Sequence, residues 1–347
     1  MHLYTKNIGK TFSGVNVLRE VDFNLEAGEV HALVGENGAG KSTFVKVLSG
    51  VYTPTDGDIF LDDKKVQINT PITAQKNGIS LIHQEPQSFP HLSVAENIFM
   101  GHMDGSNFSR VKWRDINKSS EKILSSIGLE IDPKNIMEGL SIADQQMIEI
   151  AGALSKNSKI LIMDEPTSPL TPNEVGKLFD IVKQLKDQGM AIIFISHRLE
   201  EIRAIADRVT IFRDGDLIAT NKINEISNEE IIKYMIGRSI EEIDVKENDY
   251  LKNNETILSV NNISQYGNFK NISFDLKKGE ILGFAGLVGA GRTEVAKTIF
   301  GAENFDEGEI NLKGSVILNK SPNEAIQKGF AYVPEDRKQM GIFGSVA

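Results

Sequence analysis

The stretch of sequence that decides the fold is Gly35-Glu36-Asn37-Gly38-Ala39-Gly40-Lys41-Ser42-Thr43. It follows a short apolar run, Val30–Val34, and it precedes apolar residues at helical spacing from Phe44 to Leu48. The pattern Gly-x4-Gly-Lys-Ser between a predicted strand and a predicted helix is that of a P-loop. The alternative, a glycine-rich turn with a chance lysine, is disfavoured by this strand–helix context.

Each residue type in this loop suits the binding of a nucleoside triphosphate. Small glycines let successive backbone N–H groups turn toward phosphate oxygens. The start of the following helix adds free N–H donors and a favourable dipole. We therefore expect Lys41 to contact the β- and γ-phosphates of ATP, and the Ser42 hydroxyl to ligate Mg²⁺.

Two carboxylates follow a second apolar run. Ile160–Met163 is predicted to be a buried strand, and Asp164 and Glu165 come directly after it. Open α/β sheets bind ligands at the carboxyl ends of their strands. We expect Asp164 to hold Mg²⁺, directly or through water, and Glu165 to act as general base toward the attacking water. A strand that ends in Asp-Glu is common by itself, so the functional interpretation of this one depends on the P-loop upstream.

The elements around these motifs predict a mainly parallel sheet covered by helices. A third apolar run, Ala191–Ile195, ends at Ser196-His197, and Glu174–Gln188 between the two runs has helical spacing. Strand–helix–strand order favours parallel pairing. Asp214-Gly215 is a hairpin signal between two further short strands. The predicted fold class is therefore α/β, as in a P-loop NTPase.

Composition limits the other classes of protein. The chain has 347 residues, a formal net charge of −10 and no cysteine. The acidic balance disfavours general nucleic-acid binding, which needs clustered Lys and Arg, so we expect no nucleic-acid partner. The sequence offers no disulfide and no thiolate chemistry. No apolar run approaches the ~20 residues that span a bilayer, so a membrane role would require a partner.

An internal repeat organises the chain. One constant offset pairs Gly28 with Gly279 and Gly78 with Gly329, and it needs no gap between residues 28 and 85. A repeat of this length indicates a duplicated domain rather than a solenoid. We predict a first domain at 1–237, a linker rich in charged residues and Asn at 238–255, and a second copy at 256–347.

The motifs together resemble those of the ATP-binding-cassette family. The resemblance covers essentially the whole chain and rests on five motifs in a fixed order, Gly35–Thr43, Gln84, Leu140–Asp144, Asp164-Glu165 and Ser196-His197. It implies two cassettes that close on ATP at their interface and drive a change in a membrane permease. The third motif departs from the family's Leu-Ser-Gly-Gly-Gln at its last three positions, as sugar-importer members often do. Its local pattern also predicts a capping box at the start of a helix.

The resemblance implies a role for each motif residue. Gln84 would contact Mg²⁺ and water, His197 would contact the γ-phosphate, and Ser141 would face the nucleotide of the opposing cassette. Phe12 matches the aromatic residue that stacks on adenine, with a core phenylalanine as the alternative. The expected catalytic residues are Glu165, His197 and Gln84, and the expected metal ligands are Ser42, Gln84 and Asp164. The expected ATP-binding residues are Phe12, Gly35, Glu36, Asn37, Gly38, Ala39, Gly40, Lys41, Ser42, Thr43 and Ser141.

The second copy departs from the first where chemistry would occur. Arg292 replaces the P-loop lysine, and Glu335 stands at the position of Gln84. A guanidinium is broader than an ammonium and need not fit the same cradle. These features resemble the duplicated ATPases of bacterial ribose, galactose and autoinducer-sugar importers, whose second site is degenerate. Counterparts of the later motifs would fall beyond Ala347, so we expect an incomplete second copy, through deliberate shortening, a pseudogene or a disrupted reading frame.

The resemblance implies an ATPase subunit that powers import of a sugar or sugar-like solute and lies peripherally on the cytoplasmic face of the cell membrane. Its partners would be an integral membrane permease, an extracytoplasmic solute-binding protein and a second ATP-binding cassette. One alternative is a truncated nucleotide-binding protein without transport activity. A less favoured alternative is a soluble duplicated cassette that acts on ribosomes, a class that usually has a long charged helical linker and two intact P-loop lysines.

Overall fold

The computed structural model describes residues 1–84, 87–101, 112–237, 254–286, 289–334 and 341. It divides into two compact units, Met1–Glu241 and Glu242–Ala347, which are treated separately below. Residues 238–253, most of the predicted linker, lie outside the described residues. No helix of the described part is long and apolar enough to cross a membrane.

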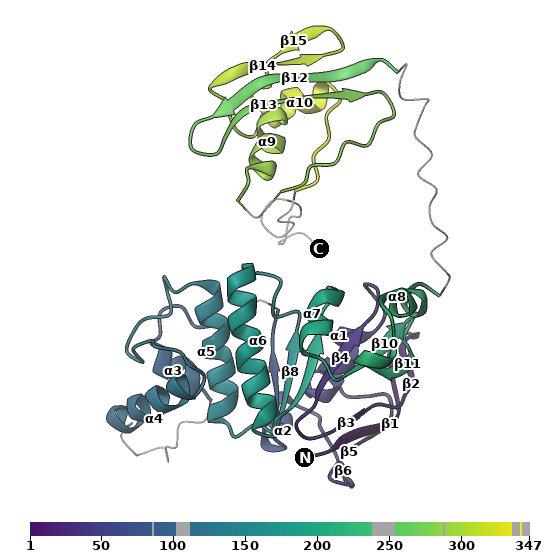
Figure 1. Cartoon of the computed structure of the whole chain (residues 1–347), viewed down its shortest axis with the longest axis vertical. Coiled ribbons are helices and arrows are strands. Elements are labelled where there is room, and N and C mark those ends of the chain that lie inside the picture. The colour runs from purple at the N-terminus through teal and green to yellow at the C-terminus, as the bar shows by residue number, and fades with distance from the viewer. Residues whose placement is uncertain (85–86, 102–111, 238–253, 287–288, 335–340, 342–347) are drawn as a thin grey trace. The chain divides into compact units, whose positions relative to one another are not determined.

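Unit 1 alternates strands and helices along most of its length (Figure 1). Its elements are β1 (Leu3–Phe12), β2 (Val15–Val21), β3 (Asn24–Leu25), β4 (Val30–Val34), α1 (Lys41–Leu48), β5 (Asp56–Leu61), β6 (Lys64–Val66), α2 (Pro71–Lys76), β7 (Ile79–Ile82), α3 (Val94–Phe99), α4 (Trp113–Ser126), α5 (Ile142–Ser155), β8 (Ile160–Asp164), α6 (Pro172–Asp187), β9 (Ala191–Ile195), α7 (Leu199–Ile205), β10 (Arg208–Arg213), β11 (Asp216–Lys222), a 3₁₀ turn (Ile223–Glu225) and α8 (Asn228–Ile236).

A six-stranded sheet forms the centre of unit 1, with strand order β11-β10-β4-β9-β8-β7. The strands from β10 to β7 run parallel, and β11 returns antiparallel to β10 at the edge. The predicted strands at Val30–Val34, Ile160–Met163 and Ala191–Ile195 are therefore confirmed, as is the hairpin at Asp214-Gly215. Parallel pairing brings the carboxyl ends of β4, β8 and β9 to one edge of the sheet.

Both faces of this sheet are buried along β4, β8 and β9, which explains why these three strands are almost continuously apolar. Val30, Ala32 and Val34 of β4 face a core that is shared with helices α3 to α7. Leu33 faces a second core, which contains Phe44 of α1 and apolar residues of the antiparallel strands. The same alternation holds along β8 and β9, because successive side chains of a strand point to opposite faces.

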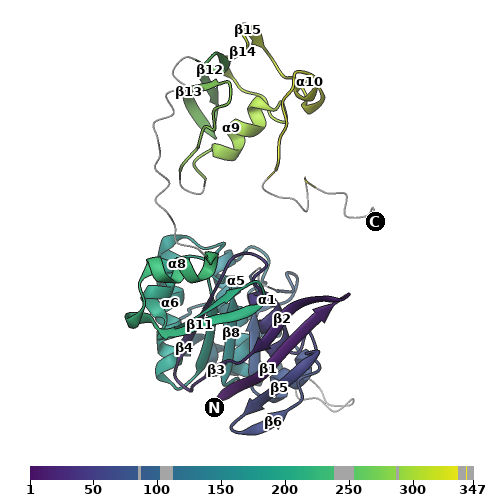
Figure 2. The same ribbon diagram turned by 90° about the vertical axis from the view of Figure 1, so that its right-hand side faces the viewer.

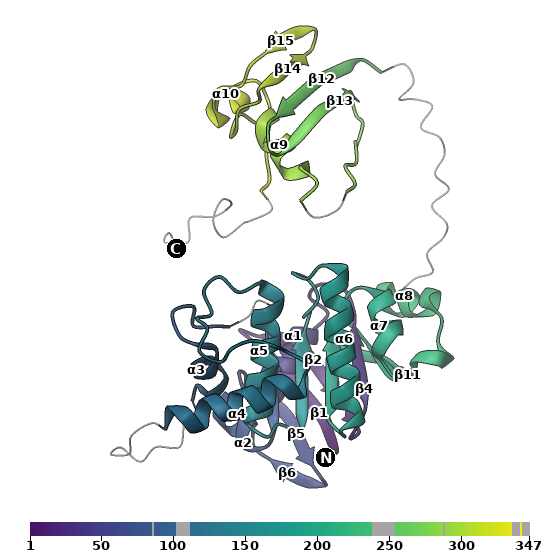
Figure 3. The same ribbon diagram turned by 60° about the vertical axis from the view of Figure 1, so that its left-hand side comes forward.

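The remaining elements of unit 1 form a second sheet and a helical group. Strands β2, β1, β5 and β6 pair in that order, with β3 beside β1, and Figure 2 shows this sheet at one side of the unit. Helices α3, α4 and α5 gather on another side (Figure 3). The P-loop lies between the parallel sheet and α1, so its position depends on both cores.

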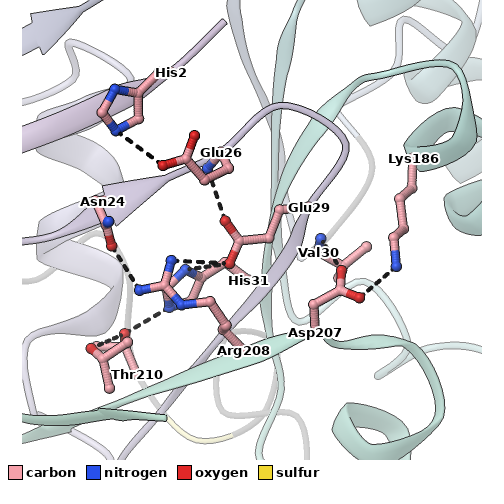
Figure 4. Close-up of polar contacts among 11 residues, drawn as sticks. His2, Asn24, Glu26, Glu29, Val30, His31, Lys186, Asp207, Arg208 and Thr210 are labelled. Atoms are coloured by element: carbon pink, nitrogen blue, oxygen red, sulfur yellow. Dashed lines mark hydrogen bonds and ion pairs between the residues drawn. The ribbon is translucent and has the colours of Figure 1, made fainter. Parts of the chain in front are cut away.

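A polar network ties the amino ends of β4 and β10 together, away from the P-loop edge (Figure 4). His31 is fully buried, with Nε2 2.7 Å from Thr210 Oγ1 and Nδ1 3.2 Å from Glu29 Oε1. Asp207 accepts the Val30 N–H at 2.9 Å and Lys186 Nζ at 2.6 Å. Burial lowers the pKa of His31, against the opposing effect of Glu29, which favours a neutral ring. These hydrogen bonds and ion pairs hold β4, β10 and α6 together at this edge of the sheet.

Unit 2 contains a four-stranded antiparallel sheet with order β13-β12-β14-β15. Strand β12 pairs with β13 and β14, as β1 pairs with β2 and β5 in unit 1. Its small core is formed by residues such as Val260, Ile263 and Ile310. The elements are β12 (Thr256–Gln265), β13 (Phe269–Lys277), α9 (Arg292–Ile299), β14 (Glu307–Leu312), β15 (Ser315–Ile317) and α10 (Pro322–Gln327).

Candidate nucleotide site

The P-loop turns sharply between β4 and α1 because its glycines adopt backbone angles that other residues avoid. Gly38 and Gly40 have φ values of 84° and 104°, in the left-handed region. A Cβ at Gly40 would lie 2.8 Å from Leu18 Cδ2, so a side chain there would also clash. Glu36, Asn37 and Gly38 at the crest of the loop are exposed, whereas Gly35, Ala39 and Gly40 at its base are buried.

Lys41 closes this loop from inside. Its side chain is 7% exposed, and Nζ donates hydrogen bonds to the Gly35 carbonyl at 2.8 Å and the Glu36 carbonyl at 3.0 Å. Burial lowers the pKa of Lys41, while Glu165 and Asp164 oppose that effect. The ammonium group is thus held at the P-loop by backbone carbonyls, and it faces two carboxylates. Ser42 and Thr43 follow in the first turn of α1, exposed and half-buried respectively.

The two predicted carboxylates lie at the end of β8. Asp164 is the last residue of the strand, and Glu165 has φ of 50°, unusual for a residue other than glycine. The Glu165 N–H donates to the Ile195 carbonyl of β9 at 3.1 Å. The bond to β9 holds this turn in place.

Gln84 and His197 meet at the Glu165 carboxylate. Gln84 Nε2 donates to Glu165 Oε2 at 3.4 Å, and His197 Nδ1 lies 3.5 Å from the same oxygen. The three residues follow β7, β8 and β9, which are neighbours in the sheet. The structure therefore brings together the three residues expected to be catalytic, although they are far apart in the sequence.

Asp164 has the environment of a ligand for a hard cation. Burial raises its pKa, Glu165 raises it further, and Lys46, Lys41 and a hydrogen bond from Ser42 lower it. The donors Ser42, Asp164 and Gln84 offer oxygen, which Mg²⁺ prefers. The described residues hold no group of three or more His, Cys, Asp or Glu side chains suited to a metal. This set fits Mg²⁺ that is bound partly by substrate phosphates, as is usual for that ion.

Phe12 stands at the end of β1, half exposed. Its ring makes an edge-to-face contact with Tyr52 at a centroid distance of 5.0 Å, and Lys10 Nζ lies 5.0 Å from its centroid. Lys46 of α1 lies 5.7 Å from the Tyr52 ring. Phe12 is therefore not a fully buried core residue, since it is 37% exposed. Its partner Tyr52 lies near Lys46 of α1, the helix that follows the P-loop.

Ser141 is not brought into this group. It is the N-cap of α5, where its Oγ accepts the Asp144 N–H at 3.1 Å and donates to Asp144 Oδ2 at 2.8 Å. The N-cap is as predicted, but the Asp144 carboxylate meets the hydroxyl instead of a backbone N–H. Aspartate is one carbon shorter than the glutamate usual at this place in a capping box. Ser141 lines a separate hollow with Ile127 and Glu174.

The matching region of unit 2 differs. Arg292 is the first residue of α9 and is exposed, in contrast to the buried Lys41. Residues 287 and 288 of the second loop and Glu335 lie outside the described residues.

Sequence reasoning missed two residues of the site region. Lys46 lowers the pKa of Asp164, and the ring of Tyr52 packs edge-to-face against the ring of Phe12. Lys46 lies on α1 with Lys41, and its helical position was the available signal. Nothing in the sequence links Tyr52 to Phe12, since the contact depends on how β1 packs near α1.

Comparison with known proteins places this geometry in a family. A family model described as "ABC transporter" matches residues 18–168 and 269–343. The ribose import ATP-binding protein RbsA 2 of Streptomyces avermitilis is 45% identical over 340 residues, which are 98% of this chain and 67% of that protein. RbsA of Caldanaerobacter subterraneus subsp. tengcongensis is 46% identical over 98% of this chain and 68% of its own length.

A solved structure shows the same fold. The crystal structure of a nucleotide-free ATP-binding cassette from an ABC transporter has a TM-score of 0.59 and 26% identity, and it covers 68% of this chain and 96% of its own. The chain spans about two thirds of the length of the curated relatives named above. With a P-loop, a carboxylate-bearing strand and matches over nearly all its residues, the chain belongs to the ABC transporter family, as an ABC transporter ATPase.

Proposed function

We propose that this chain binds and hydrolyses ATP to power the import of ribose or a related sugar. The observation that carries the proposal is the identity of 45% over 98% of the chain to a ribose import ATP-binding protein. The cluster of Lys41, Asp164 and Glu165 supports the ATPase part. The choice of sugar rests on the names of the relatives alone.

The residues of the cluster have distinct proposed roles. P-loop N–H groups and Lys41 bind the β- and γ-phosphates, and Lys41 exchanges its carbonyl partners for phosphate oxygens. Gln84 and His197 hold the Glu165 carboxylate, which accepts a proton from the water that attacks the γ-phosphorus. The bond from phosphorus to the β,γ-bridging oxygen breaks, giving ADP and phosphate. Phe12 stacks on adenine, which is worth ~1–3 kcal/mol for base–aromatic contacts.

Mg²⁺, when bound with ATP, neutralises charge that develops on the phosphate oxygens. Ser42, Asp164 and Gln84 would hold it. The hydrogen bond between Ser42 and Asp164 already places two of these oxygen donors together.

The Glu165→Gln variant tests the proposed base. Glutamine keeps the size and hydrogen bonding of the side chain but cannot accept the proton, so turnover should fall by ~10²-fold or more. ATP affinity, measured by equilibrium binding with Mg²⁺, should stay within about threefold, since binding depends on the P-loop. Glu200→Gln, an exposed carboxylate on α7, is the control and should leave both unchanged. Normal turnover in Glu165→Gln would move the base elsewhere, to His197 first.

The proposed partners are an integral membrane permease, an extracytoplasmic solute-binding protein and a second cassette, with this chain peripheral on the cytoplasmic face of the membrane. Co-expression with a sugar permease, followed by purification from membranes, tests this. Recovery of the chain with the permease, and ATP-dependent sugar uptake into vesicles, would support it. An active ATPase that never associates with the permease would instead favour a soluble role.

A further inference from the structure

Glu201 is a buried carboxylate beside the candidate site, and none of the roles proposed above uses it. It lies in the first turn of α7 and is 7% exposed. Its Oε2 accepts the Thr167 hydroxyl at 2.7 Å and the Ser196 hydroxyl at 2.6 Å. Its Oε1 accepts Arg198 Nη1 at 3.2 Å. Burial of a carboxylate is costly unless donors of this kind surround it, so Glu201 and its three donors hold one another in place.

The two hydroxyls belong to the loops that carry the proposed catalytic pair. Thr167 lies two residues after Glu165, in the loop that follows β8, and Ser196 directly precedes His197, in the loop that follows β9. Thr167 and Ser196 are 3% and 2% exposed. Short O–H···O bonds to a carboxylate are roughly twice as strong as bonds between neutral groups. One oxygen atom of Glu201 therefore joins the two loops.

The same contacts fix the backbone on both sides of His197. Ser196 Oγ accepts the Arg198 N–H at 3.0 Å while it donates to Glu201. The Arg198 guanidinium contacts the other carboxylate oxygen. The residues before and after His197 are thus bonded to one side chain. The side chain of His197 is 58% exposed, so packing alone does not orient it and the position of its backbone matters.

On the other side, Glu201 anchors the turn that follows Glu165. The Ser168 N–H donates to the Glu165 carbonyl at 3.2 Å, and the Leu170 N–H donates to the Thr167 carbonyl at 3.1 Å. The Thr167 hydroxyl attaches these turns to α7. Glu165 Oε2 and His197 Nδ1 are 3.5 Å apart, so a small shift of either loop would separate them. A misplacement of about 1 Å can cost ~10²-fold in rate.

We propose that Glu201 is a positioning residue for ATP hydrolysis, which keeps the loops of Glu165 and His197 at a fixed separation so that the His197 ring stays at the Glu165 carboxylate. The inference rests on the proposed function, in which Glu165 is the base and His197 holds it. Within the described part of the chain, no hydrogen bond joins the Glu201 side chain to the P-loop. Glu201 should therefore affect turnover and leave ATP binding nearly unchanged.

ATPase kinetics of the full chain, with all variants at one high protein concentration, test this proposal. Glu201→Ala should lower kcat at least about tenfold, while the equilibrium affinity for ATP stays within about threefold. Glu201→Gln should keep kcat within about threefold of wild type, because its amide oxygen can still accept both hydroxyls. Glu200→Ala, the exposed neighbour on α7, is the matched control and should leave kcat unchanged. Normal kcat in Glu201→Ala, or equal losses in Glu201→Ala and Glu201→Gln, would overturn the proposal.

Two hydroxyl variants test the same link if circular dichroism shows that Glu201→Ala does not fold. Thr167→Val and Ser196→Ala each remove one donor to the carboxylate and should each lower kcat by about threefold or more. Because loss of either donor separates the loops, the double variant should be no slower than the slower single variant. Losses that multiply in the double variant would show that the hydroxyls act independently, which contradicts the proposal.

The NMR signal of the His197 ring tests the geometry without turnover. Its ¹H–¹³C correlation is identified by its loss in His197→Gln. It should shift in Glu201→Ala and stay at the wild-type position in Glu200→Ala, and an unchanged signal in Glu201→Ala would overturn the positioning role. If Glu165→Gln is inactive and Glu201→Ala is fully active, only the role of Glu201 fails. If Glu165→Gln hydrolyses ATP normally, the proposed base fails, and the His197 signal still decides the role of Glu201.

Discussion

Lys41 and Arg292 occupy matching positions of the two copies but different environments. Lys41 is buried and bonded to P-loop carbonyls, whereas Arg292 is exposed. Hydrogen bonds to charged groups are worth ~1.5–3 kcal/mol, so Lys41→Ala should weaken ATP binding by ~10- to 100-fold. Arg292→Ala should change affinity less than about twofold. Titration of each variant with a fluorescent ATP analogue measures its affinity for nucleotide. Equal losses of affinity would show that both copies bind nucleotide.

The buried Glu149 of α5 predicts a pH-dependent stability for unit 1. Burial raises its pKa from 4.5 to about 7, and its Oε2 has no hydrogen-bond partner among the residues that the structure describes. Between these values the folded state holds more protons than the unfolded state, so stability falls as pH rises from 4.5 to about 7 and then levels off. The full effect is on the order of 3 kcal/mol.

Glu149→Gln should therefore flatten this slope and stabilise the protein most at pH 8. Urea unfolding at pH 5, 6, 7 and 8 measures it. Glu121→Gln, on the exposed surface of α4, is the control and should keep the wild-type profile. Parallel profiles for wild type and Glu149→Gln would show that the carboxylate is ionised in the folded state throughout.

At the scale of an element, helix α5 depends on its N-cap. Ser141 Oγ accepts the Asp144 N–H, one of the donors that a helix start leaves without a partner. Ser141→Ala should cost ~1 kcal/mol of unfolding free energy. Its effect on ATP affinity should be negligible, because the Ser141 hydroxyl bonds to Asp144 and not to the P-loop. Ser119→Ala, mid-helix and exposed on α4, should be neutral or slightly stabilising in the same urea experiment. The measurement uses protein dilute enough to be monomeric by light scattering, where a loss of affinity in Ser141→Ala would place this serine in the chain's own nucleotide site.

At the scale of the whole molecule, the prediction concerns pairing. The family resemblance implies that each nucleotide needs the signature helix of a facing cassette, and Ser141 does not join its own chain's cluster. A single chain should thus bind ATP with low basal hydrolysis. Turnover per mole should rise steeply with protein concentration, as the first domain of one chain (residues 1–237) pairs with the first domain of another. ATPase rates and light scattering over the same concentration series test this. A high rate from a monomer, constant across the series, would mean that the first domain hydrolyses ATP without a partner.

Much of unit 1 was predictable because its signals are local. Val30–Val34 and Ile160–Met163 are strands since each is a short apolar run that both cores bury. The glycines of residues 35–43 and the carboxylates of Asp164 and Glu165 can be read directly from the sequence. The roles of these residues in binding and hydrolysis remain predictions.

The sequence by itself determined the P-loop, the parallel sheet and the duplication, because local spacing and chain order specify them. Only the tertiary structure decided that Gln84 and His197 share one oxygen of Glu165, that Tyr52 supports Phe12, and that residues 281–285 form no strand. The physical reason is common to all three. A contact between distant residues depends on which strands lie side by side, and a strand exists only where a neighbour accepts its hydrogen bonds.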